Sequence, residues 1–292
     1  MLSIFTTARP FRPPFDVIQR NAITSWLGLA PRPQVILLGS DEGSAEIAAE
    51  FDLVHVPRVE CNRFGSPRID ALFAAAESVA EHDTMCFINA DIILTDDVLP
   101  AIQRVTERIE RSVIIGRRWN LDVESAWDFG SPDAYQKIRD TTKTHGSVAP
   151  VGYMDYFVYP KGFWGVVPPF AIGAGRLDNW LVHRAVSLGA AVVDASESIT
   201  AIHQNHDQPE ELSRKYEHGG RLPGLKENTR LCHDNWDRLW IGIGTVEECT
   251  HVLDPRGLKR QWRRTDILRR LAAVPVARPV VGPLIRAWYA GR

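Results

Sequence analysis

The stretch TMCFINADIIL, residues 84–94, places Asn89 and Asp91 at the end of a short apolar run. Such a strand either enters an ordinary turn or holds a carboxylate over a site. The segment AIHQNHD likewise sets His203 and His206 after an apolar stretch. Carboxylates and imidazoles are residue types that bind divalent cations, and imidazole suits Mn²⁺ better than Mg²⁺. The alternative is that Asp91 is a turn residue and the histidines are polar loop residues.

The elements that position these residues alternate in type through the first 115 residues. The predicted strands are LSIFTT, QVILLGS, LVHVP, TMCFIN and SVIIG. Four helices are predicted. The first is capped by Asp16, the second covers residues 44–51, the third begins at Ser66 and Pro67, and the fourth covers TDDVLPAIQRVTERI. Strand–helix alternation predicts an α/β fold with a mainly parallel sheet, covered by helices on both faces.

The pattern is looser after residue 116. The segment RRWNLDVESAWDFGSPDAY is rich in aromatic and polar residues and is interpreted as irregular. Further strands are predicted at YFVYP, AAVVDA and SITAIH, and a helix at LDNWLVHRAVSLG, ended by Gly189. We expect one main domain over residues 1–250 and a basic tail over residues 251–292.

Polar residues gather at the predicted strand ends. In an α/β sheet the ligand binds at the carboxyl ends of the strands. Those ends carry Thr6, Thr7, Arg9, Asp41, Glu42, Asn89, Asp91, His203 and His206. The glycine fingerprint of a dinucleotide fold is missing after the first strand, and no GxxxxGK[ST] phosphate loop occurs. These absences disfavour two common nucleotide-binding designs.

This order of features resembles the GT-A glycosyltransferases, the nucleotide-sugar-dependent class related to family 2, over roughly residues 1–210. In such enzymes a D-x-D motif holds a divalent cation on the diphosphate, and Asn89-Ala90-Asp91 stands in its place here. Asn89 departs from the motif. The resemblance therefore implies that Asp91 is the main ligand of the Mn²⁺ or Mg²⁺, and that Asn89 hydrogen-bonds a ribose hydroxyl. One carboxylate leaves the cation short of ligands, and His203 or His206 could complete the set.

The same resemblance divides the main domain into a nucleotide-binding half, residues 1–115, and an acceptor-binding half, residues 116–210. It implies that base, ribose, phosphate and sugar of the donor meet residues at the first strand ends and at the start of the helix near residue 70. These are Thr6, Thr7, Arg9, Asp41, Arg68 and Asp70. A helix N-terminus favours anions, which supports Arg68 near a phosphate. Surface salt bridges are the alternative for Arg68 and Asp70.

Asp178 lies at the start of a predicted helix, after two glycines that let the backbone pass close to a sugar. Similar enzymes carry an acidic residue at this point that acts as the catalytic base on the acceptor hydroxyl. Asn179 and Trp180 would then line the acceptor side. The alternatives are an acidic residue favoured by the helix dipole and, for Trp180, a place in the core.

The segment GYMDYFVYPKGFWG is dense in aromatic residues and contains Asp155 and Tyr156. Carbohydrate sites use aromatic faces against C–H groups and carboxylates against hydroxyls, so both residues are candidates for acceptor binding. An aromatic core with Asp155 in a turn fits equally well.

The predicted activity is metal-dependent transfer of a sugar from a UDP- or GDP-linked donor to the hydroxyl of a carbohydrate or lipid-linked acceptor. With Asp178 as base, direct displacement with inversion is the simpler mechanism. One alternative is a sugar-phosphate nucleotidyltransferase, although its G-x-G-x-R signature is missing from TTARPFRPP. Another is a non-catalytic nucleotide or carbohydrate binder with a degenerate motif, and Asn89 in place of the first Asp is consistent with it.

Bulk composition narrows the class further. The chain has 292 residues, 45% hydrophobic and 24% charged, with a net charge of −2. That charge gives no case for nucleic-acid binding. The four cysteines form no CxxC pair, no signal peptide is recognised, and no apolar run is long enough for a membrane span. We expect a cytoplasmic protein.

The tail segment LKRQWRRTDILRRLAAV sets Trp262, Ile267, Leu268 and Leu271 among basic residues. This pattern suits peripheral contact with an anionic membrane surface. The alternatives are a helix that packs on the catalytic domain through these apolar residues, and a nucleic-acid patch.

Overall fold

The computed structural model describes residues 1–206, 223–235, 244–262, 276, 279–281 and 283. Through residue 115 strands and helices alternate as expected. The elements are β1 (Leu2–Thr7), α1 (Phe15–Leu27), β2 (Gln34–Leu38), α2 (Ser44–Glu50), β3 (Val54–Val56), α3 (Ile69–Val79), β4 (Thr84–Ile88), β5 (Ile92–Leu94), α4 (Val98–Thr106) and β6 (Ser112–Ile115).

The second half adds shorter elements. These are β7 (Trp119–Leu121), α5 (Ala134–His145), β8 (Ser147–Val148), β9 (Tyr156–Pro160), α6 (Leu177–Ser187), β10 (Ala191–Asp194), β11 (Ala201–Gln204), α8 (Pro223–Asn235), the 3₁₀ turn Val246–Glu248, β12 (His251–Asp254) and β13 (Gly257–Arg260). The segment expected to be irregular after residue 116 therefore contains β7 and runs into α5.

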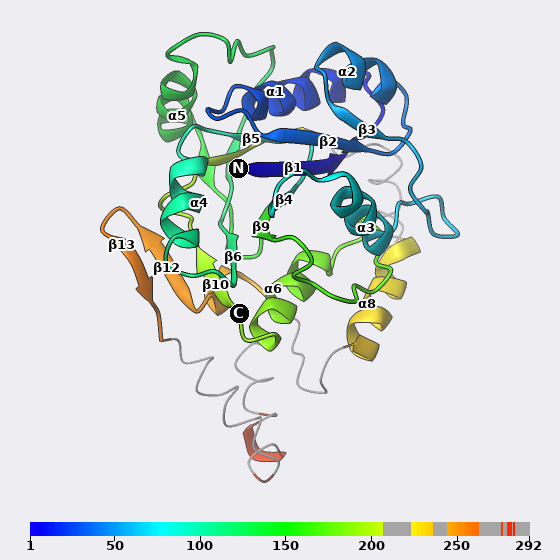
Figure 1. Cartoon of the computed structure of the whole chain (residues 1–292), viewed down its shortest axis with the longest axis vertical. Helices are drawn as coiled ribbons and strands as arrows, with labels where there is room; N and C mark the ends of the chain where they lie inside the picture. The colour runs from blue at the N-terminus through cyan, green and yellow to red at the C-terminus, as the bar shows by residue number, and fades with distance from the viewer. Residues whose placement is uncertain (207–222, 236–243, 263–275, 277–278, 282, 284–292) are drawn as a thin grey trace.

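The central sheet has the strand order β13-β12-β10-β6-β9-β4-β1-β2-β3 within the described residues. Strands β1 to β4, and separately β6, β10 and β12, pair in parallel, whereas β9 is antiparallel to both β4 and β6. The sheet joins two parallel halves through one reversed strand (Figure 1). The predicted α/β fold with a mainly parallel, helix-flanked sheet is confirmed.

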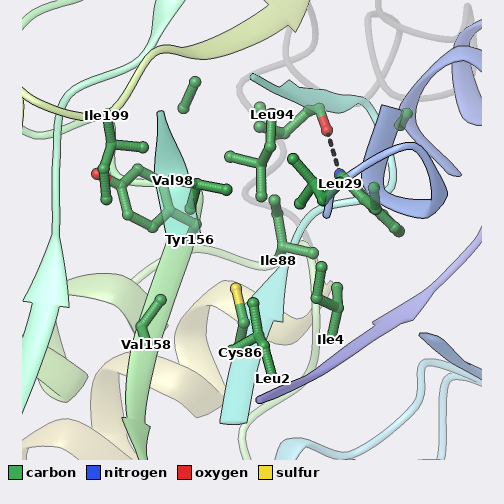
Figure 2. Packing of buried hydrophobic residues seen from close by; sticks show 14 of the residues in the cluster. Leu2, Ile4, Leu29, Cys86, Ile88, Leu94, Val98, Tyr156, Val158 and Ile199 are labelled. Atoms are coloured by element: carbon green, nitrogen blue, oxygen red, sulfur yellow. Dashed lines mark hydrogen bonds between the residues drawn. The ribbon is translucent and has the colours of Figure 1, made fainter. Parts of the chain in front are cut away.

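Each face of the sheet carries its own apolar core. Successive side chains of a strand point to opposite faces, so Ile4 joins a cluster with α1, α2 and α4 while Phe5 joins one with α3 and α6. Figure 2 shows part of the first cluster, in which Ile4, Ile88 and Tyr156 pack together. Because helices cover both faces of the sheet, polar side chains lie at the carboxyl edge of β1, β2 and β4.

A second sheet, of order β5-β11-β7-β8, lies beside this edge. The predicted strand SITAIH forms β11 here and not in the central sheet, where it pairs antiparallel with β5 and sets His203 opposite Ile92. The indole of Trp26 in α1 donates to the Ile92 carbonyl at 2.9 Å, which fixes β5 against the helix.

Two predicted helix starts are wrong. α1 begins at Phe15 after Pro14, and Asp16 lies inside the first turn, where it accepts from Arg20 at 2.9 Å instead of capping the helix. α3 begins at Ile69, not at Ser66 and Pro67. Residue 67 instead forms a β-bridge with residue 61, which keeps this segment extended.

The predicted tail begins inside the central sheet. β12 and β13 form a hairpin that pairs with β10, so residues 251–260 extend the sheet. Trp262, 63% exposed, follows them with the Arg260 guanidinium 4.4 Å from its ring centre. Ile267, Leu268 and Leu271 lie outside the described residues, so membrane contact stays a prediction. Within the described chain no helix has the length and apolarity to cross a membrane.

Candidate metal and nucleotide site

Asp91, His203 and His206 come together at the junction of the two sheets. One Asp91 carboxylate oxygen, Oδ2, lies 3.5 Å from His203 Nε2 and 3.4 Å from His206 Nε2. One ligand atom from each of the three residues falls within 4.8 Å of the others. The three side chains are largely buried, with exposures of 23%, 12% and 10%. The structure thus brings together the three residues predicted to bind the metal.

Strand pairing produces this cluster. Asp91 directly precedes β5, and the antiparallel ladder between β5 and β11 carries His203 back beside it. Gln204 donates to the Asp91 carbonyl from its backbone N–H at 3.3 Å and from its side-chain amide at 3.2 Å. The ring of Phe15 packs edge-on against His206, with 5.0 Å between ring centres. Backbone pairing therefore places Asp91 and His203 side by side, and a ring contact packs His206.

The electrostatics favour an ionised carboxylate. Burial alone would raise the pKa of Asp91, but the hydrogen bonds from His203 and His206 outweigh it and hold that pKa well below its usual range. Within the described part of the chain, Asp91 Oδ1 and His203 Nδ1 are buried without a hydrogen-bond partner.

A buried carboxylate oxygen left without a donor, next to two imidazoles, fits a divalent cation. One carboxylate with two imidazoles suits first-row transition metals such as Mn²⁺ better than Mg²⁺, which prefers oxygen ligands. The residues present therefore fit the predicted metal.

A cleft of about 480 Å³ opens beside Asp91. Of the residues predicted to bind donor or metal, it is lined by Thr7, Arg9, Asp41, Asn89 and Asp91. The cleft also touches Gly173, whose φ of 71° lies in the left-handed region that glycine adopts most readily. Of the two glycines before Asp178, Gly173 brings backbone to the wall of this cleft.

Arg9 is held at the rim by its backbone. The buried amide of Gln19 accepts from the Arg9 N–H at 2.6 Å and donates to the Arg9 carbonyl at 3.0 Å. The guanidinium lies 4.7 Å from the ring centre of Phe15, which also packs on His206. Arg9 and His206 thus contact the same aromatic ring, and Arg9 and Asp91 line the same cleft.

Three of the predicted donor-binding residues lie elsewhere. Thr6 is buried, at 1% exposure, and donates to the Thr7 carbonyl at 3.4 Å. Arg68 donates to Asp70 at 3.1 Å and to Glu60 at 2.8 Å. None of Thr6, Arg68 and Asp70 lines the cleft. The surface salt bridge given as the alternative for Arg68 and Asp70 is what the structure contains.

Next to the cleft, Asn89, Asp155 and Arg118 form a polar cluster. Asn89 Nδ2 donates to Asp155 Oδ1 at 2.7 Å, and Arg118 Nη1 donates to Asp155 Oδ2 at 3.0 Å. Burial raises the pKa of Asp155, with Arg118 opposing this shift and Asp91 adding to it. Sequence reasoning missed Arg118, which follows β6 in the segment interpreted as irregular; a basic residue at a strand end was the available signal.

Asp178 lies in the first turn of α6, as predicted. Burial, with a further contribution from the negative charge of Asp155, raises the pKa of Asp178 to about 7, although Arg118 opposes the shift. Within the described residues its carboxylate has no assigned hydrogen bond or ion pair. This is a carboxyl group that can take or release a proton near neutral pH.

The other predicted acceptor residues have structural contacts. Tyr156 is fully buried in the core (Figure 2), and Trp180, 2% exposed, packs on Phe170 at 5.3 Å between ring centres. Asn179 donates to the Gly244 carbonyl at 2.9 Å. The placement of Tyr156 and Trp180 gives no support for contact with an acceptor, and matches the core alternative.

Comparison with known proteins gives no family for the chain. No family model matches it, and no curated protein matches it. Among solved structures, it is similar to S. aureus TarS 1–349 in complex with UDP-GlcNAc, with a TM-score of 0.48, 11% identity, and coverage of 80% of this chain and 73% of that one.

A second similar structure is glucosyl-3-phosphoglycerate synthase from Mycobacterium tuberculosis, in complex with Mn²⁺, UDP and glucosyl-3-phosphoglycerate. Its TM-score is 0.47 and its identity 13%, with coverage of 82% of this chain and 81% of that one.

Proposed function

We propose that this protein is a GT-A-type glycosyltransferase that moves a sugar from a UDP- or GDP-linked donor to an acceptor hydroxyl. The observation that carries the proposal is the Asp91–His203–His206 cluster at the wall of a cleft of about 480 Å³. A cleft of this size falls within the range that small-molecule and cofactor sites occupy. A diphosphate-linked substrate requires a cation site next to a cleft of nucleotide size, and Asp91 belongs to both.

Asp91, His203 and His206 would hold the cation. When bound, it neutralises the charge that develops on a departing diphosphate. The donor set supports Mn²⁺ over Mg²⁺. Arg9, fixed at the rim by Gln19, adds a second positive charge for the same phosphates.

The remaining cleft residues fit the rest of the donor. Thr7 is the last residue of β1, Asp41 follows β2, and both line the cleft. Strands β1 and β2 are the next two strands after β4, which leads to Asp91, so these two residues suit the base and the ribose. Burial raises the pKa of Asp41. In a nucleoside diphosphate the ribose lies between base and phosphates, so Asn89, which lines the cleft two residues before Asp91, suits a ribose hydroxyl.

Asp178 supplies the base. A pKa of about 7 matches general base catalysis at neutral pH, because the carboxylate is then both ionised in part and strongly proton-accepting. Asp178 would accept the proton of the acceptor hydroxyl as that oxygen attacks the anomeric carbon. One base on the acceptor side favours direct displacement with inversion. The acceptor would be a carbohydrate or a lipid-linked sugar.

A donor panel tests the proposal. Purified protein is incubated with UDP- and GDP-sugars and Mn²⁺ or Mg²⁺, and released nucleoside diphosphate is measured with and without candidate acceptors. We expect release with one nucleotide class, dependent on the cation and lost in Asp91→Ala, while the exposed-site variant Asp122→Asn behaves as wild type. Release that persists in chelator, or in Asp91→Ala, would remove the metal from the proposal.

A further inference from the structure

Asn89 and Asp155 form a pair that joins two neighbouring strands at the site. Asn89 follows β4, Asp155 precedes β9, and the Asn89 backbone N–H donates to the Asp155 carbonyl at 3.0 Å. The side chains repeat the link, with Asn89 Nδ2 donating to Asp155 Oδ1 at 2.7 Å. Backbone and side-chain bonds thus connect the same two residues.

The partner fixes which end of the Asn89 amide faces the cleft. A carboxylate oxygen only accepts hydrogen bonds, so it must meet the amide NH₂ and not the amide oxygen. The Asn89 oxygen therefore points away from Asp155, and Asn89 lines the cleft. Within the described residues, no hydrogen bond to this oxygen is assigned. It remains available to a ligand hydroxyl.

Both oxygens of Asp155 are already engaged. Oδ1 accepts from Asn89, and Oδ2 accepts from Arg118 at 3.0 Å. The Asp155 side chain is 10% exposed and that of Arg118 is 14% exposed. Arg118 is itself held by Asn120, whose side-chain oxygen accepts from its Nε at 3.1 Å. A carboxylate in this position is a structural partner and has little capacity left for an acceptor.

We propose that Asp155 is a positioning residue, which with Arg118 as its counter-ion orients the Asn89 amide so that its oxygen accepts a hydrogen bond from the donor. The pair accommodates one carboxylate. Asp in place of Asn89 would set two carboxylates at hydrogen-bond distance, where like charges repel unless the pair takes up a proton. The inference rests on the proposed function for the identity of the ligand, and on the geometry alone for the pairing.

A swap of the two side chains tests this. Asn89→Asp sets two carboxylates face to face, and Asp155→Asn removes the charged acceptor that Asn89 and Arg118 share. The double variant Asn89→Asp/Asp155→Asn restores one amide and one carboxylate. Thermal unfolding without ligand reports the pairing, and titration with UDP or GDP in the presence of Mn²⁺ reports the positioning. We expect each single variant to bind nucleotide about tenfold or more weakly, as for loss of a charge-assisted hydrogen bond, and the double variant to recover most of this loss.

An exposed pair of the same chemistry is the matched control. Asn205 Nδ2 donates to Asp122 Oδ1 at 2.8 Å, and both residues are exposed. Asp122→Asn should change neither the unfolding temperature nor nucleotide affinity, because exposed polar pairs contribute little.

The outcomes separate the two claims. An Asn89→Asp variant that binds nucleotide as tightly as wild type, or a double variant no more stable than the singles, overturns the inference. Wild-type protein that binds neither UDP nor GDP overturns the proposed function, while the ligand-free unfolding series still decides the pairing.

Discussion

Asp91 and Asp178 are the same residue type, yet their surroundings move their pKa values in opposite directions. Asp91 is buried against two imidazoles, which hold its pKa well below the usual range. Asp178 is raised to about 7 by burial, with the negative charge of Asp155 nearby. Two carboxyls with separated pKa values can take different roles. The comparison therefore fits the proposed roles, in which Asp91 keeps its charge beside a cation and Asp178 exchanges a proton.

The two residues also differ in how the chain holds them. Asp91 lies where the backbone ladders of both sheets meet, and Gln204 bonds to its carbonyl. Asp178 lies in the first turn of a helix that is packed on the core through Leu181 and Trp180. Strands therefore position the proposed metal ligand Asp91, and the packing of one helix positions the proposed base Asp178.

The largest effect is expected at Asp178. Asp178→Asn keeps the size of the side chain and the helix start but removes the base, so turnover should fall by roughly 10³-fold. Mn²⁺ and nucleotide binding should stay near wild type, since the cation ligands are elsewhere. Steady-state rates and calorimetric titration of the same preparation measure both. Turnover within about threefold of wild type would assign the base to another residue.

Trp180 tests the helix that carries the base. It is 2% exposed, so Trp180→Ala should lower the free energy of unfolding by about 3–5 kcal/mol. Mn²⁺ affinity should be unchanged at temperatures where the variant is folded, because strands hold the metal side. Urea unfolding gives the stability. A variant of normal stability that fails to turn over would instead show that Trp180 contacts the substrate.

The strands and several cleft residues could be predicted, because both depend on local sequence patterns. Apolar runs mark the strands, and the residues just after them reach the carboxyl edge of the sheet, so Thr7, Asp41, Asn89 and Asp91 were found from position alone. The approach of His203 to Asp91 depends on the pairing of β11 with β5, which no local pattern contains.

The predicted site residues that lie away from the cleft do so for two reasons. Tyr156 and Trp180 are aromatic residues beside a predicted site, and the strand and helix that carry them are apolar on more than one face, so periodicity does not separate core from site. Arg68 and Asp70 are two residues apart and pair with each other. The charged residues near this helix start therefore form an ion pair and not a ligand site.

The pH dependence of stability sharpens the comparison of the two aspartates. Folding raises the pKa of Asp178 from about 4 in an unfolded chain to about 7, so the native state binds this proton more tightly. Its contribution to stability is fully present below about pH 4 and is lost as the pH rises towards about 7. The difference in unfolding free energy between wild type and Asp178→Asn should follow this course. A difference that is independent of pH across this range would contradict the raised pKa.

The smallest effect is expected at Tyr156. Its hydroxyl is buried and has no hydrogen-bond partner in the described residues. Tyr156→Phe removes only that hydroxyl, so the free energy of unfolding should change by less than about 1 kcal/mol and could rise. Nucleotide binding and turnover should be unchanged. A clear loss of turnover with normal stability would restore Tyr156 as an acceptor-binding residue.

The central claim is that Asp91, His203 and His206 hold one divalent cation. Calorimetric titration of Mn²⁺ into wild type, Asp91→Ala and Asp122→Asn tests it without a substrate. Wild type and Asp122→Asn should each bind one Mn²⁺ with equal affinity. Asp91→Ala should retain its circular dichroism spectrum and lose at least about a hundredfold in affinity, because the only carboxylate of the set is gone. Mn²⁺ binding to Asp91→Ala with wild-type affinity would contradict the account.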